Sequence, residues 1–335
     1  MRVLSGNSGT SCGVEAVPDG MGAPLTAPLV ERLAIIGMGL IGSSIARAAR
    51  RSNAAAKIVA YDWQPEVQNR VRELALADEI GASAEAAVRG ADLVILCVPI
   101  GANGEVARKI APGLKPGAIV TDVGSVKSAV EAAIAPHIPA SVHLIPAHPV
   151  AGTEQSGPDA GFASLFLHRW CILTPPEGAD PDAIERVRAF WQALGSNVET
   201  MTAAHHDLVL AITSHLPHLI AYNIVGTAAD LEDTLRAEVI KFSAGGFRDF
   251  TRIAASDPTM WRDVFLHNKE AVLEMLGRFN EDLSALQRMI RRGDGDGLFD
   301  LFTRTRAIRM GIVALGQETA APDFGRARED APQGG

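Results

Sequence analysis

Three glycines at a fixed spacing constrain this chain more than any other feature of its sequence. Gly37, Gly39 and Gly42 lie in the segment GMGLIGSS, directly after the apolar run LAII. At this spacing the first glycine permits a tight turn, the second lets a phosphate approach the backbone, and the third allows a helix to pack against the preceding strand. The N–H groups at the start of that helix would point at the phosphates. The segment predicts the first strand, turn and helix of a Rossmann-type domain. A glycine-rich turn of another α/β fold is the alternative.

An acidic residue at the end of the next apolar run extends this pattern. Asp62 ends the run KIVAYD and lies 20 residues after Gly42. A carboxylate at this place can hydrogen-bond the ribose hydroxyls of a dinucleotide, and it repels the 2′-phosphate of NADP. No arginine or lysine follows Asp62 directly. We therefore predict NAD as the cofactor. In the alternative, Asp62 is a solvated acid at a strand end.

Four neighbouring residues complete the predicted cofactor site. Leu40 and Ile41 lie within the glycine segment, and Val98 and Pro99 follow the apolar run DLVILC. Strand ends on this side of such a sheet border the cofactor. We therefore include all four, although Pro99 in the alternative interpretation only stops its strand.

The chain divides into two patterns and two tails. From residue 31 to 201, strand-like runs alternate with helical stretches, which is typical of a parallel sheet covered on both faces. From 202 to 317 the strand-like runs vanish and helical periodicity dominates. We predict an α/β Rossmann-type N-terminal domain followed by an all-α C-terminal domain, with the active site between them. Residues 1–30 and 318–335 are rich in small and polar residues and are predicted to be disordered tails.

Composition excludes several classes of function. The chain has 335 residues and a net charge of -8, so it has no general electrostatic reason to bind nucleic acid or an anionic membrane. No run of 18 apolar residues appears, so no membrane span is predicted. Its three cysteines form no CxxC pair and no cluster with histidine, which argues against a disulfide framework and against a metal site. A cytoplasmic protein is expected.

His148 is the main candidate for chemistry. It lies at the end of an apolar run in LIPAHPVAGTEQSG, where a histidine beside a nicotinamide can act as a general base. Ser125, in TDVGSVK, also follows a strand-like run and is predicted to start a helix. Each has a structural alternative: His148 as a histidine satisfied within the fold, and Ser125 as a plain helix N-cap.

A second group of candidates lies in the segment SHLPHL. Ser214, His215 and His218 surround Pro217 within an otherwise apolar helical pattern. Proline removes a helical hydrogen bond, so a kink or break is predicted there. Histidines beside such a kink are functional candidates, and core packing alone is the alternative.

Arginines in the segment GGFRDFTRIAASDPTMWRD can hold an anionic substrate. A guanidinium binds a carboxylate through two parallel hydrogen bonds. The segment contains Arg248, Arg252 and Arg262. Ion pairs with the neighbouring aspartates are the alternative, and are expected for at least one arginine. Arg252 is favoured because its apolar neighbours suggest partial burial.

Taken in order, the motifs GMGLIGSS, DVGSVK, HPVAGTE, SHLPH, FRDFTRIA and DPTMWRD resemble those of the prephenate/arogenate dehydrogenase family over residues 31–317. The resemblance implies that His148 is the catalytic base and that Ser125 assists at the substrate hydroxyl. It implies that Arg252 holds the side-chain carboxylate and that Glu154 helps to gate the site. Ser214, His215, His218 and Arg248 would belong to the substrate site.

This resemblance also implies a reaction and an assembly. The reaction is oxidative decarboxylation of prephenate or arogenate in tyrosine biosynthesis, and the assembly is a homodimer built by the helical domain. The choice between the two substrates stays open. One alternative is a hydroxyacid dehydrogenase of the 6-phosphogluconate-like group, but the lysine and asparagine it would need, Lys269 and Asn268, are adjacent rather than spaced by helical turns. A non-catalytic NAD-binding regulatory protein is another.

Overall fold

The computed structural model describes residues 24–153, 155–230, 238, 241 and 245–314. Contacts between residues divide the chain into two compact units, Met1–Val272 and Leu273–Gly335. The first unit contains the strands and also the helices between residues 203 and 272. Of the two predicted tails, the described part is residues 24–30, where the Leu25 N–H donates to the Ser52 carbonyl at 2.9 Å. The remainder of both tails lies outside the described residues.

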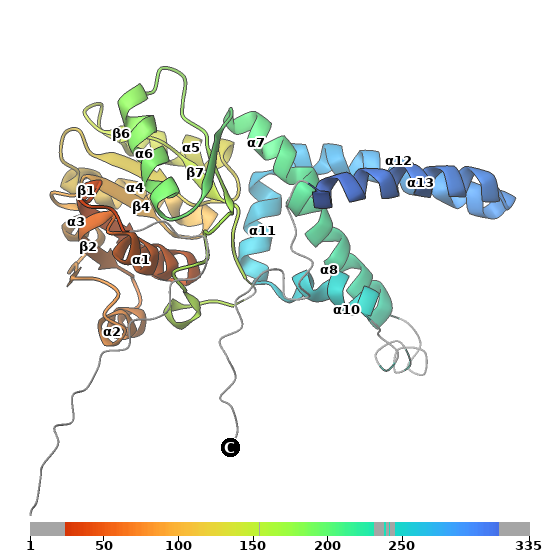
Figure 1. Cartoon of the computed structure of the whole chain (residues 1–335), viewed down its shortest axis with the longest axis horizontal. Helices are drawn as coiled ribbons and strands as arrows, with labels where there is room; N and C mark the ends of the chain where they lie inside the picture. Colours follow the sequence, from red (N-terminus) through yellow and green to blue (C-terminus); the bar gives the residue numbers. More distant parts are fainter. Residues whose placement is uncertain (1–23, 154, 231–237, 239–240, 242–244, 315–335) are drawn as a thin grey trace, which may run out of the picture. The chain divides into compact units, whose positions relative to one another are not determined.

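A six-stranded parallel sheet forms the centre of the first unit, in the order β3-β2-β1-β4-β5-β6 (Figure 1). Its strands coincide with the apolar runs read from the sequence, apart from the short β3. They are β1 Val30–Ile36, β2 Ala55–Tyr61, β3 Glu79–Ile80, β4 Leu93–Leu96, β5 Ile119–Asp122 and β6 His143–Leu144. The chain leaves β1 in one direction along the sheet to β2 and later returns to its other side at β4. Such a switch point leaves a crevice at the carboxyl ends of the strands.

Both faces of this sheet are buried, as the sequence predicted for a doubly covered parallel sheet. In β1, Leu33 and Ile35 belong to a cluster that includes residues of α1, whereas Ala34 and Ile36 belong to a second cluster on the other side. Consecutive strand side chains point to opposite faces, so the two clusters mark the two faces. The covering helices include α1 Leu40–Ser52, α2 Pro65–Glu73, α3 Ala84–Val88, α4 Asn103–Ile110 and α5 Ser128–Ile134.

A second, three-stranded sheet carries His148. It consists of β7 Ala147–Pro149, β8 Trp170–Leu173 and β9 Asn197–Thr200, with α6 Pro181–Ala193 beside them. β7 is antiparallel to β8, so this part departs from the all-parallel arrangement that the alternating pattern predicted. The run HLIPAH divides at Pro146, which lacks the N–H that the ladder of the first sheet needs. Ile145 still donates to the Val120 carbonyl at 2.9 Å, and after Pro146 the chain joins the second sheet.

One continuous helical stretch, Ala203–Ala229, follows the second sheet. It comprises α7 Ala203–Leu210, a π-helical turn at Ala211–His215 and α8 Leu216–Ala229. The sequence predicted a kink or break at Pro217, but the helix does not break. The wider π turn ends just before the proline, where the missing N–H would interrupt an ordinary α-helix.

By length and composition alone, the Ala203–Ala229 stretch is the one described helix that could cross a membrane. Its polar residues His206, Asp207 and His215 are nevertheless buried within the first unit. Core helices of folded domains pass the same compositional test, although only 28% of the apolar window of this stretch is buried in the single chain. The first unit then continues with α10 Gly245–Thr251, the short helix η6 Arg252–Ala255 and α11 Pro258–His267.

Helices also form the second unit. α12, Lys269–Arg292, runs from the first unit into it and ends at Gly293, whose φ of +64° closes the helix. α13, Gly295–Ala314, follows. Several large apolar side chains on these two helices are exposed in the single chain: Leu273, Leu283, Ile290, Phe299, Phe302, Ile308, Met310 and Ile312. An apolar surface of this kind is typical of a protein interface.

Candidate active site

The glycine turn after β1 has the geometry that its sequence predicted. Gly37 has a φ of +96°, and a Cβ there would overlap the carbonyl oxygen of Cys97, which directly follows β4. A Cβ on Gly42 would overlap the Gly37 carbonyl oxygen, so α1 packs against the turn itself. A Cβ on Gly39 would meet nothing within 4 Å, which leaves this glycine open to a ligand. The turn therefore combines two close approaches inside the fold with one open backbone surface.

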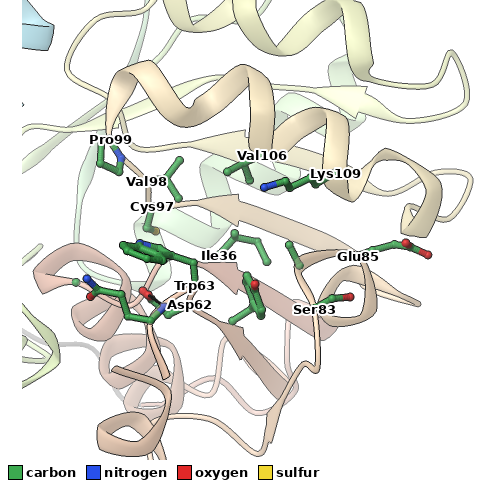
Figure 2. Close-up of a pocket in the computed structure, with 15 residues that line it drawn as sticks. Ile36, Asp62, Trp63, Ser83, Glu85, Cys97, Val98, Pro99, Val106 and Lys109 are labelled. Atoms are coloured by element: carbon green, nitrogen blue, oxygen red, sulfur yellow. Dashed lines mark hydrogen bonds between the residues drawn. The ribbon is translucent and has the colours of Figure 1, made fainter. Parts of the chain in front are cut away.

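A cavity of about 510 Å³ lies at this turn, at the switch point between β1 and β4. Figure 2 shows its walls: Asp62 and Trp63 after β2, and Cys97, Val98 and Pro99 after β4. The start of α1 has no side-chain cap and no acidic residue in its first turn, so its N–H groups are available to an anion. These features fit a dinucleotide.

Asp62 also contributes to the shape of the turn. One carboxylate oxygen accepts a hydrogen bond from the Met38 N–H at 2.9 Å, and the other accepts from the Gln64 N–H at 3.0 Å. The carboxylate is therefore held in place beside the cavity, where a ribose would lie in a dinucleotide complex. Cys97 is half-buried and lines the cavity.

His148 lies in the middle of β7 and is 7% exposed. Its Nδ1 atom is 2.8 Å from Nε2 of His206, and the two rings meet edge to face with centroids 5.1 Å apart. His206 is on α7 and is fully buried. Its other nitrogen, Nδ1, lies 2.9 Å from the Asp207 carboxylate. The candidate base therefore belongs to a hydrogen-bonded row of three side chains.

Asp207 joins this row to the start of α5. Its carboxylate accepts the backbone N–H groups of Lys127 at 2.7 Å and Ser128 at 2.9 Å. Burial by itself raises the pKa of Asp207, but the hydrogen bonds from His206 and from these two backbone groups outweigh it, so the pKa is lowered. Asp207 is therefore a carboxylate at neutral pH.

A buried ion pair supports the strand of His148 from the other side. Lys127 Nζ lies 2.5 Å from the Asp122 carboxylate and donates to the Ala147 carbonyl oxygen at 2.6 Å. Both charged side chains are fully buried. Burial lowers the pKa of Lys127, although Asp122 opposes this effect. Since Ala147 directly precedes His148, the ion pair fixes the backbone that carries this histidine.

His215 and His218 are positioned by different neighbours. His215 is fully buried at the end of the π turn, and its Nδ1 lies 3.0 Å from Nδ2 of Asn268, which also donates to the Asp207 carbonyl oxygen. His218 donates from Nδ1 to the Ser214 carbonyl at 2.8 Å, and its ring stacks on Trp261 with centroids 3.6 Å apart. His215 thus ends a π turn and His218 follows it on α8, and such turns often mark functional sites.

His148, His206, His215 and His218 form a histidine cluster, and all four have lowered pKa values. Burial is the largest cause in each case, and it lowers the pKa of His148 well below its usual 6.5 and that of His215 to about 4. Lys127 lowers the pKa of His148 further, and so would a positive charge on His206 or His215. The pKa values of His206 and His218 fall for the same main reason. The histidines are therefore neutral at physiological pH, as a proton acceptor must be.

The arginines differ from the sequence expectation. Arg252, predicted to be partly buried, is exposed in the single chain, because it lies on the short helix η6 rather than on a packed face. It is still close enough to His218 to lower the pKa of that histidine. The expected surface ion pairs are present: Arg248 pairs with Asp249 at 3.5 Å and Arg262 pairs with Asp263 at 2.7 Å.

Three candidates remain: Ser125, Ser214 and Glu154. Ser125 is half-buried in the loop after β5, three residues before the helix it was predicted to start, and α5 begins at Ser128. Ser214 is half-buried in the π turn. Glu154 lies outside the described residues.

Sequence reasoning missed the residues that hold His148. Asp122 and Lys127 lie at the two ends of the motif DVGSVK, and His206 and Asp207 stand in the segment AHHDLVL. A signal was present in both places, because charged residues interrupt segments that otherwise read as buried. A polar residue at a buried position requires partners, but the pattern alone does not say which ones.

Fold and site together define a Rossmann-type dinucleotide-binding protein whose first unit holds both the nucleotide cavity and a buried, histidine-centred site. The family models narrow this class. Residues 45–200 match the model described as prephenate dehydrogenase, nucleotide-binding domain, and residues 202–304 match prephenate dehydrogenase, dimerization domain. The chain belongs to the prephenate dehydrogenase family.

Individual relatives agree with this assignment. A cyclohexadienyl dehydrogenase of Zymomonas mobilis is 43% identical over 282 residues, which cover 84% of this chain and 96% of the relative. The crystal structure of a prephenate dehydrogenase from A. aeolicus, in complex with hydroxyphenyl propionate and NAD+, superimposes with a TM-score of 0.79 at 35% identity, covering 84% of this chain and 98% of that one. An arogenate dehydrogenase from Synechocystis has a TM-score of 0.72 at 29% identity, covering 84% and 99%. The Rossmann-type and helical parts predicted from the sequence are confirmed.

Proposed function

We propose that this chain is an NAD-dependent dehydrogenase that oxidises and decarboxylates prephenate, arogenate or both in the synthesis of tyrosine. The observation that carries the proposal is the match of two consecutive family models, which together span most of residues 45–304. The cavity at the glycine turn and the neutral, buried His148 support it independently.

Proton transfer to His148 begins the reaction. The substrate ring bears a hydroxyl at C4 and a carboxylate at C1. His148 accepts the hydroxyl proton as C4 is oxidised to a carbonyl carbon, and a neutral imidazole is required for this step. Bound NAD supplies the acceptor for the hydride that leaves C4. Carbon dioxide then leaves C1, and the electron pair of the broken bond enters the ring, which becomes aromatic when the C4 oxygen regains a proton. Aromatisation makes the overall reaction irreversible.

The substrate contacts are assigned by role. Ser125 assists His148 at the hydroxyl, and Arg252 holds the side-chain carboxylate, for which its exposed guanidinium and its place beside His218 are suitable. The stacked ring of His218 and the buried ring of His215 form the wall of the substrate site, together with Ser214, whose carbonyl oxygen accepts a hydrogen bond from His218. Arg248 and Glu154 complete the proposed set.

Cofactor contacts follow the turn and the cavity. Gly37, Gly39, Leu40, Ile41 and Gly42 provide the turn and the helix start that receive the pyrophosphate. Asp62 receives the ribose, and Val98 and Pro99 border the cofactor from the end of β4. The carboxylate of Asp62 favours NAD over NADP.

Assembly and location are part of the same proposal. A homodimer would cover the apolar side chains that α12 and α13 expose in the single chain, and the second family model is a dimerization domain. We assign the substrate and dimerisation role to residues 202–317, the nucleotide-binding role to residues 31–201, and a cytoplasmic location to the whole. No nucleic acid or membrane partner is proposed.

The deciding experiment measures NADH formation by the purified full chain with prephenate and with arogenate, each with NAD and with NADP. Turnover of either acid with NAD is expected, and the ratio of the two kcat/KM values gives the preferred side chain. Absence of turnover with both acids, in protein that still binds NAD, would contradict the proposed reaction.

A further inference from the structure

The hydrogen-bonded row from His148 through His206 to Asp207 determines which nitrogen of His148 carries a proton. We infer that His206 and Asp207 are positioning residues that select the reactive nitrogen of His148, holding the proton on its Nδ1 and leaving the Nε2 lone pair to receive the substrate proton. This inference rests on the proposed function, in which His148 is the base.

The argument starts at the carboxylate, which can only accept. Asp207 receives the backbone N–H groups of Lys127 and Ser128, and it is ionised at neutral pH. His206 Nδ1 lies 2.9 Å from the same carboxylate. A lone pair on Nδ1 would face the negative oxygen at that distance and would be repelled. Nδ1 of His206 therefore carries a proton and donates it.

The next bond in the row follows from the first. A neutral imidazole has one donor and one acceptor nitrogen, so Nε2 of His206 bears a lone pair. Its neighbour at 2.8 Å is Nδ1 of His148, which must donate for a hydrogen bond to form. The proton of neutral His148 then lies on Nδ1, and Nε2 is left as the acceptor. This is the tautomer that a general base with a single free nitrogen needs.

The row also acts on the charge that forms during the reaction. When Nε2 of His148 takes the hydroxyl proton, the ring becomes positive while Nδ1 keeps its proton and its bond to His206. Burial opposes that charge, and so does the nearby Lys127. The carboxylate of Asp207, joined to the ring through His206, stabilises it. Besides His206, the titratable groups around His148 are Lys127, His215, Asp207, Asp122 and Cys171.

Two substitutions at residue 206 isolate the hydrogen-bond acceptor. His206→Leu removes it, and His206→Gln returns a carbonyl oxygen close to the position of Nε2. We expect His206→Leu to lower kcat roughly 10- to 100-fold, less than loss of the base itself, with the KM for NAD little changed. His206→Gln is expected to recover a large part of kcat. His205→Gln, on the exposed side of the same helix, is the matched control and should behave as the wild type.

The pH profile separates positioning from mere folding. In Asp207→Asn the stabilising charge is lost, so the pKa of the base in the enzyme–substrate complex falls and the acid limb of kcat moves to lower pH as kcat decreases. Loss of correctly folded protein would lower kcat at every pH without moving the limb. An unmoved limb, or His206→Gln no more active than His206→Leu when both bind NAD normally, overturns the inference.

A spectrum of the wild-type protein tests the inference without any loss of folding. Long-range 15N–1H correlation of 15N-histidine-labelled protein reports which nitrogen of each ring carries the proton, and His148→Asn identifies the signals of His148. The expected result is a protonated Nδ1 and an unprotonated Nε2, and the opposite tautomer overturns the inference. This result does not depend on turnover, so it stands apart from the assay with prephenate and arogenate that tests the proposed reaction.

Discussion

The glycine turn and the histidine cluster lie in the same compact unit but are encoded in different ways. The turn is built from a short segment, and its geometry follows from the steric limits of the backbone, as the positive φ of Gly37 illustrates. The cluster draws on His148 of β7, Asp207 of α7, Lys127 just before α5 and Asn268 just after α11. Local chemistry dictates the first region, whereas tertiary packing creates the second. Substitutions in the glycine turn should therefore affect NAD binding or stability, whereas substitutions in the histidine cluster should affect turnover.

The strongest test of this difference removes the base. His148→Asn should lower kcat roughly 100- to 10,000-fold, because the substrate hydroxyl loses its proton acceptor. Binding of NAD should be retained, since the glycine turn and its cavity do not include His148. Steady-state kinetics together with titration of NAD measure the two effects separately. A variant with nearly normal kcat would remove His148 from the mechanism.

Two glycine substitutions sharpen the comparison from the other side. Gly37→Ala should destabilise the protein by roughly 2–5 kcal/mol, because its Cβ meets the Cys97 carbonyl and its φ is positive. Gly39→Ala should leave stability nearly unchanged, since nothing lies within 4 Å of the added Cβ, yet should raise the KM for NAD about tenfold or more by obstructing the pyrophosphate. Urea denaturation and NAD titration distinguish the two. Equal loss of stability in both variants would contradict the assigned roles.

Arg252 tests whether an exposed residue belongs to the site at all. Arg252→Gln should raise the KM for the substrate roughly 10- to 100-fold, the loss expected for a charged hydrogen-bonding partner, with a smaller change in kcat. Arg278→Gln is the control, because Arg278 is an exposed arginine paired with Glu274 one helical turn away. If the two variants have the same KM, Arg252 does not bind the substrate carboxylate.

The same contrast between local and tertiary features explains which parts of the fold and the site could be predicted from the sequence. Strand positions, the glycine turn and Asp62 were predictable because each depends on a few consecutive residues or a fixed spacing. The division of HLIPAH between two sheets was not predicted, although Pro146 was visible, because the second sheet requires pairing with β8. Partial burial of Arg252 was inferred from its apolar neighbours and was wrong, since those neighbours lie on a short surface helix. The hydrogen-bond partners of His148 could not be predicted from the sequence, because residue 206 is far from residue 148 along the chain.

Acidification offers a test that acts on the histidine cluster while leaving the glycine turn unchanged. The pKa values of His148, His206, His215 and His218 lie below the usual 6.5, so the unfolded chain binds protons more readily than the folded one as the pH falls. Stability is therefore full above about pH 6.5 and decreases below it. For His215 alone, with its pKa near 4, the loss at about pH 5 is roughly 2 kcal/mol.

Most carboxylates titrate below this window, but Glu131 is an exception, because burial raises its pKa and its protonation partly opposes the loss of stability. Asp and Glu residues with lowered pKa values, Asp78 and Asp92 among them, lose their stabilising effect only as the pH falls through their unfolded values near 4. Urea midpoints of the cofactor-free protein between about pH 7.5 and pH 5 thus report mainly on the histidines. His215→Asn retains an oxygen that can accept from Asn268 and should flatten the dependence, whereas the exposed His205→Asn should leave it unchanged. A stability that stays constant over this range would mean that the cluster accepts protons without cost, and the neutral row proposed for His148 would then lose its physical basis.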